Sequence, residues 1–239
     1  MNTDFSEKVV LVAGGTGGLG RSVSLTFLRQ GASVAVTWRH QEEFAALASA
    51  ANAHATRLAG FNVDVIDPDA TLDLVNQILS RWSRLDVLVN AVGAYAGGIP
   101  LWKLEPDVFE RMLNLNLRAS YALAKAVAPV MIPRKSGSII NVAAKAAWDH
   151  AAGASAYAAS KAASLALIDS LAADLAGTGV RVNSVLPSII DTPANRRAMP
   201  GSDFSKWPKP DDIAEVVLFL ASDDARVVHG ASIPVFGNG

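Results

Sequence analysis

Residues 10–22 of this 239-residue chain read VLVAGGTGGLGRS and carry the strongest signal for its fold. A β-branched apolar run ends at Ala13, a glycine-rich turn follows, and a helical pattern begins. Gly14, Gly18 and Gly20 let the backbone turn tightly and come close to a phosphate group, which the free N–H groups at a helix start stabilise. The spacing is G-x-x-x-G-x-G, and its position between a strand and a helix predicts a phosphate-binding turn.

Short β-branched runs alternate with longer helical patterns along the rest of the chain. The predicted strands are KVVLVAG, SVAVTW, TRLAGFNVDV, LDVLVN, GSIINVA, VRVNSVLP and ASIPVF, and the predicted helices include residues 106–129 and 155–176. This alternation is typical of parallel strands joined by crossover helices. We predict an α/β fold, a Rossmann-like doubly wound parallel sheet of about seven strands flanked by helices, with a ligand crevice at the carboxyl ends of the strands.

The composition indicates a single folded domain over residues 1–239. Hydrophobic residues make up 51% of the chain and charged residues 18%, and no repeat or linker divides it. The least regular segment, residues 188–210, is rich in proline and polar residues and too long for an ordinary connection. We interpret it as a substrate lid, with a plain surface excursion as the alternative.

Charge and residue types exclude several classes of function. The formal net charge is −1 and basic residues are scattered, which does not favour nucleic acid as a partner. The chain has no cysteine and its four histidines lack metal-ligand spacing, so we expect no metal site. It begins without a signal-peptide pattern, and no apolar run reaches about 18 residues. We therefore expect a cytoplasmic protein that acts on a small-molecule substrate without a membrane partner.

Six motifs in a fixed order resemble the short-chain dehydrogenase/reductase family over essentially the whole chain. They are Ala13 to Gly20, Asp64-Val65, NAVG at Asn90–Gly93, NLNL around Asn116, YAASK at Tyr157–Lys161 and LPSIIDTP at Leu186–Pro193. The departures are Ala13 where threonine is usual, Ala91 where a second asparagine is usual, and Ser188 where glycine is usual. The resemblance implies an NAD(P)-dependent oxidoreductase.

The resemblance also implies a cofactor-binding set that spans the chain. Asp64 and Val65 are expected near the adenine. Ile190 and Thr192 are expected to hold the nicotinamide carboxamide. The full set is Gly14, Thr16, Gly18, Leu19, Gly20, Arg39, Asp64, Val65, Asn90, Ala91, Gly93, Lys161, Pro187, Ile190 and Thr192.

The end of the second predicted strand, SVAVTWRH, bears on which dinucleotide binds. An acidic residue there would accept hydrogen bonds from the adenosine ribose of NAD and repel the 2′-phosphate of NADP. Trp38 occupies that place, and Arg39, whose guanidinium can pair with a 2′-phosphate, follows it. We therefore favour NADP(H), with NAD(H) as the alternative if Arg39 is only solvated.

Tyr157 and Lys161, four residues apart on a predicted helix, form the predicted catalytic pair. An ammonium group and the positive nicotinamide lower the pKa of a nearby tyrosine from about 10, which makes Tyr157 a general acid near neutral pH. By family resemblance, Lys161 also holds the nicotinamide ribose, and Asn116 anchors a water that relays protons.

Ala144 stands thirteen residues before Tyr157, where the family has a serine that hydrogen-bonds the substrate oxygen. Loss of one such donor costs about two to three orders of magnitude in rate. Three explanations remain open. Ser155 replaces the serine, the substrate does not need the donor, or the protein no longer catalyses.

The substrate side resembles the quinonoid dihydropteridine reductases, which also lack the serine. The likeness lies in AAKAAWDHAAGASAYAASKAA, LPSIIDTPANRRAMPGSDFSKW and VGAYAGG. Reduction of an electron-poor conjugated ring demands less stabilisation of an alkoxide than reduction of a ketone. We predict a pterin-like substrate, with Tyr95, Ser155 and Trp207 as candidate contacts. The alternatives are a carbonyl reductase or alcohol dehydrogenase with another donor, and a non-catalytic dinucleotide-binding sensor.

The helices near 106–129 and 155–176 carry more apolar and small residues than one buried face needs. The clearest stretch is SKAASLALIDSLAADLAG. Such a surface suggests a subunit interface. We predict a homodimer or homotetramer built on these helices, as the family resemblance also implies.

Overall fold

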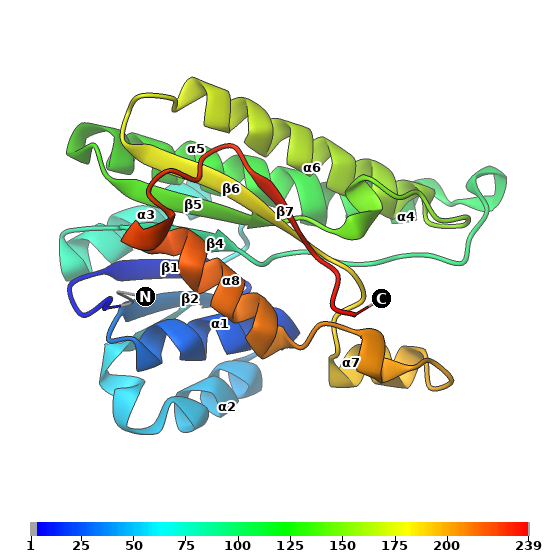
Figure 1. Cartoon of the computed structure of the whole chain (residues 1–239), viewed down its shortest axis with the longest axis horizontal. Coiled ribbons are helices and arrows are strands. Elements are labelled where there is room, and N and C mark those ends of the chain that lie inside the picture. Colours follow the sequence, from blue (N-terminus) through cyan, green and yellow to red (C-terminus); the bar gives the residue numbers. More distant parts are fainter. Residues whose placement is uncertain (1–3, 239) are drawn as a thin grey trace.

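Seven parallel strands form the sheet of the computed structural model, which describes residues 4–238 (Figure 1). They are β1 (Val9–Ala13), β2 (Ser33–Trp38), β3 (Leu58–Asn62), β4 (Val87–Asn90), β5 (Gly137–Val142), β6 (Val180–Pro187) and β7 (Ser232–Val235). Their order in the sheet is β3-β2-β1-β4-β5-β6-β7. The chain moves outward from β1 to β3 and then returns to β4, so the crevice of this doubly wound sheet opens beside β1 and β4. The predicted fold class is confirmed.

Helices cover both faces of the sheet (Figure 1). One face carries α1 (Gly18–Arg29), α2 (Gln41–Ala51) and α8 (Pro210–Ala221), and the other carries α3 (Pro68–Trp82), α5 (Ala119–Met131) and α6 (Ser155–Asp174). α4 (Pro106–Leu113) packs on α6, and the short α7 (Pro193–Ala198) follows β6. Short 3₁₀ segments cover Asn52–Arg57, Leu101–Lys103, Ile132–Arg134, Lys145–Ala147, Phe204–Lys206 and Asp223–Ala225.

The sheet separates the two largest clusters of the apolar core, as the sequence of β1 illustrates. All five residues of β1 are buried. Val10 and Val12 pack with α1 and α8, whereas Val9 and Leu11 pack on the opposite face with α3 and α5. Successive side chains of a strand point to opposite faces, so a central parallel strand needs a continuous apolar run.

The predicted helix 106–129 is interrupted. α4 ends at Leu113, residues Asn114–Arg118 form a π-helical turn, and α5 continues to Met131. A π-turn adds one residue to the helical turn and is frequent at functional sites. Here it contains Asn116, which is 1% exposed. The second predicted helix, 155–176, is observed as α6 and ends two residues earlier, at Asp174.

The segment 188–210 is more regular than its composition indicates. Thr192 caps α7 by accepting a hydrogen bond from the Asn195 backbone N–H at 3.2 Å. Arg196 makes a two-pronged ion pair with Asp191 and stacks its guanidinium 4.7 Å from the Phe204 ring centroid. Internal contacts of this kind give the segment a defined conformation.

Candidate active site

The carboxyl ends of the strands bring the predicted motifs to one edge of the sheet. Strand register pairs Ala13 with Asn90, and Asn90 with Asn141. The turn after β1 holds Gly14, Thr16 and Gly18. Arg39 follows β2, and Asp64 and Val65 follow β3. Ala91 and Gly93 follow β4, and Ile190 and Thr192 follow β6. Parallel strands end at the same edge, so residues far apart in the sequence converge there.

The glycine-rich turn forms a cradle that side chains would fill. Gly14 has a φ of 73°, in the left-handed region that favours glycine, and its N–H donates to Thr37 Oγ1 at 2.8 Å. A Cβ on Gly20 would collide with the Gly14 carbonyl oxygen. Gly17 precedes α1 and supplies no side-chain cap, which leaves the first N–H groups of this helix to an anion. This cradle fits the pyrophosphate of a dinucleotide.

Two pairs of polar side chains lie beyond the ends of β2 and β3, beside the glycine-rich turn. Arg39 Nη2 lies 3.3 Å from Asp64 Oδ1, and both side chains are 55% exposed. The Thr16 hydroxyl donates to Glu43 Oε2 at 3.0 Å. Glu43 lies in the first turn of α2 and belongs to no sequence motif, so it was not predicted as a site residue.

The start of α7 approaches the start of α1 across the crevice. A Cβ on Gly18 would lie 2.9 Å from Thr192 Cγ2. Ile190 packs against the core cluster that contains α1. The segment 188–210 therefore begins directly beside the glycine-rich turn.

Lys161 is buried where the β4 loop, α6 and β5 meet. Lys161 is 5% exposed, and its Nζ donates to the Val142 carbonyl oxygen at 2.9 Å. A Cβ on Gly93 would lie 3.1 Å from Lys161 Nζ and 2.9 Å from Asn116 Oδ1. Burial lowers the pKa of Lys161 to about 8.

Asn116 clamps the β4 loop to α6. Its Oδ1 accepts from the Ala94 N–H at 3.0 Å, and its Nδ2 donates to the Ala94 carbonyl and to Ser160 Oγ, each at 3.0 Å. The Ser160 hydroxyl donates in turn to the Tyr157 carbonyl oxygen at 2.8 Å. Ser160 was not predicted from the sequence, although its place three residues after Tyr157 within YAASK was a usable signal.

A second buried network supports this clamp. Asn90 Nδ2 donates to Ser120 Oγ at 2.9 Å and to Asn141 Oδ1 at 3.2 Å. Ser120 Oγ lies 2.8 Å from Ser164 Oγ and donates to the Asn116 carbonyl oxygen at 3.0 Å. Buried hydrogen bonds of this kind hold α5, α6 and the ends of β4 and β5 in one arrangement.

Tyr157 lies beside Tyr95, and their rings pack edge to face with centroids 5.0 Å apart. Burial, with a smaller contribution from the charge of Tyr95, raises the pKa of Tyr157 to about 12. The predicted lowering of this pKa needs the positive charge of a bound nicotinamide as well as the Lys161 ammonium, and in the protein alone the pKa is raised instead. The half-buried ring loses hydration, and the Lys161 ammonium is directed at the Val142 carbonyl. The phenol stays protonated at neutral pH and is able to donate a proton.

Ala144 and the other two predicted substrate contacts, Ser155 and Trp207, lie in three different segments of the chain. Ala144, 7% exposed, precedes the 3₁₀ turn at Lys145–Ala147 and brings no hydroxyl. Ser155 begins α6, and its buried Oγ has no hydrogen-bond partner within residues 4–238. Trp207 packs against Phe204, with ring centroids 4.9 Å apart, inside the segment 188–210.

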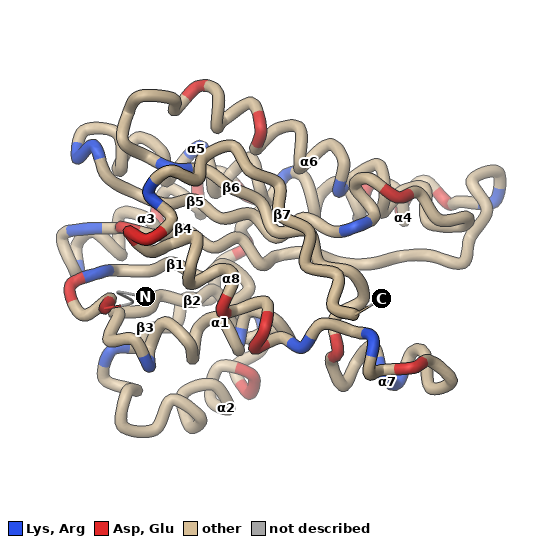
Figure 2. The backbone as a smooth tube through the Cα atoms, viewed as in Figure 1, with Lys and Arg blue, Asp and Glu red and all other residues tan. Residues whose placement is uncertain are grey.

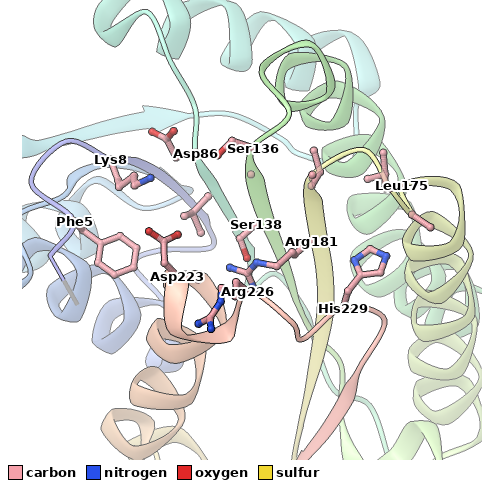
Figure 3. Close-up of a pocket in the computed structure, with 17 residues that line it drawn as sticks. Phe5, Lys8, Asp86, Ser136, Ser138, Leu175, Arg181, Asp223, Arg226 and His229 are labelled. Carbon is pink, nitrogen blue, oxygen red and sulfur yellow. The ribbon is translucent and has the colours of Figure 1, made fainter. Parts of the chain in front are cut away.

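A cavity of about 480 Å³ lies at the opposite, amino edge of the sheet (Figure 3). Its polar lining includes Lys8, Asp86, Arg181, Asp223, Arg226 and His229. Asp86 is already paired with Arg84 and Arg134 at 2.8 Å. The Arg181 guanidinium donates to the carbonyls of Leu220 and Ser222. Several of the charges here stabilise the fold, and the cavity lies away from the Tyr157 edge.

Basic and acidic residues are interspersed along the backbone (Figure 2). Within residues 4–238, no group of three or more His, Asp or Glu side chains is arranged to hold a metal ion. Over the same residues, no helix has both the length and the apolar character needed to cross a bilayer.

Comparisons with known proteins agree with this geometry. The family described as short chain dehydrogenase matches residues 8–202. A 3-oxoacyl-acyl-carrier-protein reductase of Thermotoga maritima is 31% identical over 238 residues, covering 96% of this chain and 96% of that protein. The solved structure of ElxO with NADP bound is 26% identical, with a TM-score of 0.90, and the match covers 96% of this chain and 97% of ElxO. The solved structure of a short-chain type dehydrogenase/reductase from Mycobacterium ulcerans is 25% identical, with a TM-score of 0.93, and the match covers 98% of this chain and 90% of that one.

Proposed function

The chain belongs to the short-chain dehydrogenase family of NAD(P)-dependent oxidoreductases, and we propose that it reduces a flat, conjugated, pterin-like substrate with Tyr157 as the general acid. The observation that carries the proposal is a protonated tyrosine beside an exposed aromatic ring, in a site whose usual serine position is Ala144. A conjugated electron-poor ring accepts hydride without developing a full alkoxide, so it does not need the missing hydroxyl.

Each residue of the site has a separate task in this proposal. A bound nicotinamide dinucleotide supplies the hydride. Tyr157 holds the proton that the reduced substrate takes up, and the high pKa keeps it on the phenol until transfer. Lys161 offers a buried cation toward the cofactor ribose. Asn116 positions the Ala94 peptide and, through Ser160, the backbone of Tyr157.

The cofactor set is assigned from its place around the crevice. The turn at Gly14–Gly20 holds the pyrophosphate, and the loops after β3, β4 and β6 hold the adenine and nicotinamide ends. Arg39 favours NADP(H), because a guanidinium can pair with a 2′-phosphate. The neighbour ElxO, solved with NADP bound, supports a dinucleotide in this fold.

The substrate is placed between the β4 loop and the segment 188–210. Tyr95 is 68% exposed beside Tyr157, so one of its faces is available for stacking on a flat heterocycle. The segment 188–210 is proposed as the lid, since it starts against Gly18 and carries the exposed Arg196, which is ion-paired to the nearly buried carboxylate of Asp191.

A carbonyl reductase is the second candidate function. The relative from Thermotoga maritima is described as a reductase of 3-oxoacyl groups, and a ketone needs a donor to its oxygen. The Ser155 hydroxyl, which has no partner within residues 4–238, is the group that could supply it after a change of rotamer.

The assembly that we propose is a homodimer or homotetramer through α4, α5 and α6. Phe109 and Tyr121 are exposed by 37% and 42% on α4 and α5, and Ala159 and Ala166 are exposed on α6. Small residues allow close helix contact. The absence of cysteine is compatible with the reducing cytoplasm, which we propose as the location.

The test is a turnover assay with NADPH and, separately, NADH, supplied with quinonoid dihydropterin or with a panel of ketones and quinones. We expect dihydropterin turnover that Tyr157→Phe reduces by about three orders of magnitude, because a general acid contributes about 10²–10⁴-fold. Nucleotide binding by the variant serves as the control for folding. Turnover of ketones alone would support the second candidate and overturn the pterin-like substrate.

A further inference from the structure

We propose that Glu43 discriminates between the two dinucleotides by placing a carboxylate where the 2′-phosphate of NADPH would need to lie. The inference rests on the proposed use of a nicotinamide dinucleotide. In this proposal, Glu43 weakens the preference for NADP(H) that is expected from Arg39.

The carboxylate reaches the crevice from a position that the strand pattern does not indicate. In a dinucleotide fold, the acid that accepts the ribose hydroxyls stands at the end of the second strand, and here Trp38 occupies that place. α2 begins three residues later, and its first turn directs Glu43 back to the glycine-rich turn. The Thr16 hydroxyl donates to Glu43 Oε2 at 3.0 Å, across a separation of 27 residues.

This hydrogen bond joins the two segments between which an adenosine ribose binds. Thr16 belongs to the turn that holds the pyrophosphate, and Glu43 follows the strand end that faces the ribose. The ring of Trp38 stacks on Phe44 at 5.9 Å and 16°, which orients the first turn of α2. A carboxylate in this position is able to accept a hydrogen bond from a ribose hydroxyl.

The same carboxylate would repel a phosphate group on the ribose. A 2′-phosphate beside Thr16 and Arg39 would meet the negative charge of Glu43 at short range. Arg39 offers only partial compensation, because its guanidinium already lies 3.3 Å from Asp64 Oδ1. Arg39 is therefore shared with Asp64, while Glu43 adds a second carboxylate beside Thr16, a charge balance that admits NADH and weakens the attraction for NADPH.

The experiment measures binding of 2′,5′-ADP and 5′-AMP by calorimetry, since these probes differ only in the 2′-phosphate and require no turnover. The variant is Glu43→Gln, and the matched control is Glu42→Gln, an exposed glutamate in the same helical turn. We expect Glu43→Gln to raise the ratio of 2′,5′-ADP to 5′-AMP affinity about tenfold. The effect should shrink at high salt, because exposed charges are screened. Glu42→Gln should leave the ratio within about twofold.

An unchanged ratio in Glu43→Gln, or an equal change in Glu42→Gln, would overturn the role of Glu43 while leaving the proposed function intact. Failure of the unmodified protein to bind either nucleotide, NADH or NADPH would overturn the proposed function and this inference together. Melting temperatures of the two variants verify that each is folded.

Discussion

Tyr95 closes one side of Tyr157, with their ring planes at 77° and their centroids 5.0 Å apart. The pair joins a residue of the β4 loop to the first turn of α6, and the pKa of the half-buried Tyr157 phenol is raised mainly by burial, with a smaller contribution from Tyr95. The contact therefore links the exposed rim of the site to the group proposed to move the proton.

Replacing Tyr95 tests this link. Tyr95→Ala should lower the pKa of Tyr157 toward its ordinary value, because water reaches the phenol, and should raise KM for a flat substrate up to about tenfold through loss of ring stacking. Tyr95→Phe keeps the ring and should leave KM within about twofold. Ultraviolet titration of the tyrosines and steady-state kinetics measure the two effects. Equal KM values for the alanine and phenylalanine variants would contradict a stacking role.

Gly93→Ala should damage the site without unfolding the protein. The added Cβ would meet Asn116 Oδ1 at 2.9 Å and Lys161 Nζ at 3.1 Å, so one of these groups must move. We expect turnover to fall at least tenfold, as a small misplacement of catalytic groups is costly. Gly201→Ala is the control, because a Cβ there meets no atom within 4 Å. Full activity of Gly93→Ala would show that this close approach is not needed.

Lys161 should make stability depend on pH in a defined window. Its pKa is about 8 in the folded protein and ordinarily 10.5, so the unfolded chain binds more protons between these values. The free energy of unfolding should therefore rise as pH increases through that window. Between about pH 8 and 9.5, the free energy of unfolding of the unmodified protein should rise on the order of 2 kcal/mol more than that of Lys161→Met. Urea unfolding of both proteins without nucleotide measures it, and parallel pH profiles would rule out a depressed lysine pKa.

Ala144→Ser distinguishes the two candidate substrates. A hydroxyl at this position restores a donor to a substrate oxygen, so turnover of ketones should rise about a hundredfold, whereas dihydropterin turnover should change little. Ala146→Ser, a partly exposed neighbour, controls for the added hydroxyl. If ketones are good substrates before the change and gain nothing from it, another donor such as Ser155 already acts.

The sequence predicted the fold because the relevant signals are local. The apolar run of β1, the glycine-rich turn and the alternation of strand and helix patterns each span a few residues, and they determine an all-parallel sheet. Local patterns were less informative about the helix at 106–129, where a π-turn breaks the regular period, and about residues 188–210, where Asp191 and Arg196 pair within the segment.

The residues alone predicted that Tyr157 and Lys161 share a helix, and they show that Ala144 lacks a hydroxyl and that glycine allows the turn at Gly14. The contacts across long separations became visible in the folded chain. Asn116 binds the Ala94 peptide 22 residues away, and Thr16 binds Glu43 27 residues away. The tertiary structure also decided the raised pKa of Tyr157 and the lowered pKa of Lys161. The physical reason is that hydration and hydrogen-bond partners depend on which surfaces the folded chain brings together, and no short pattern contains that information.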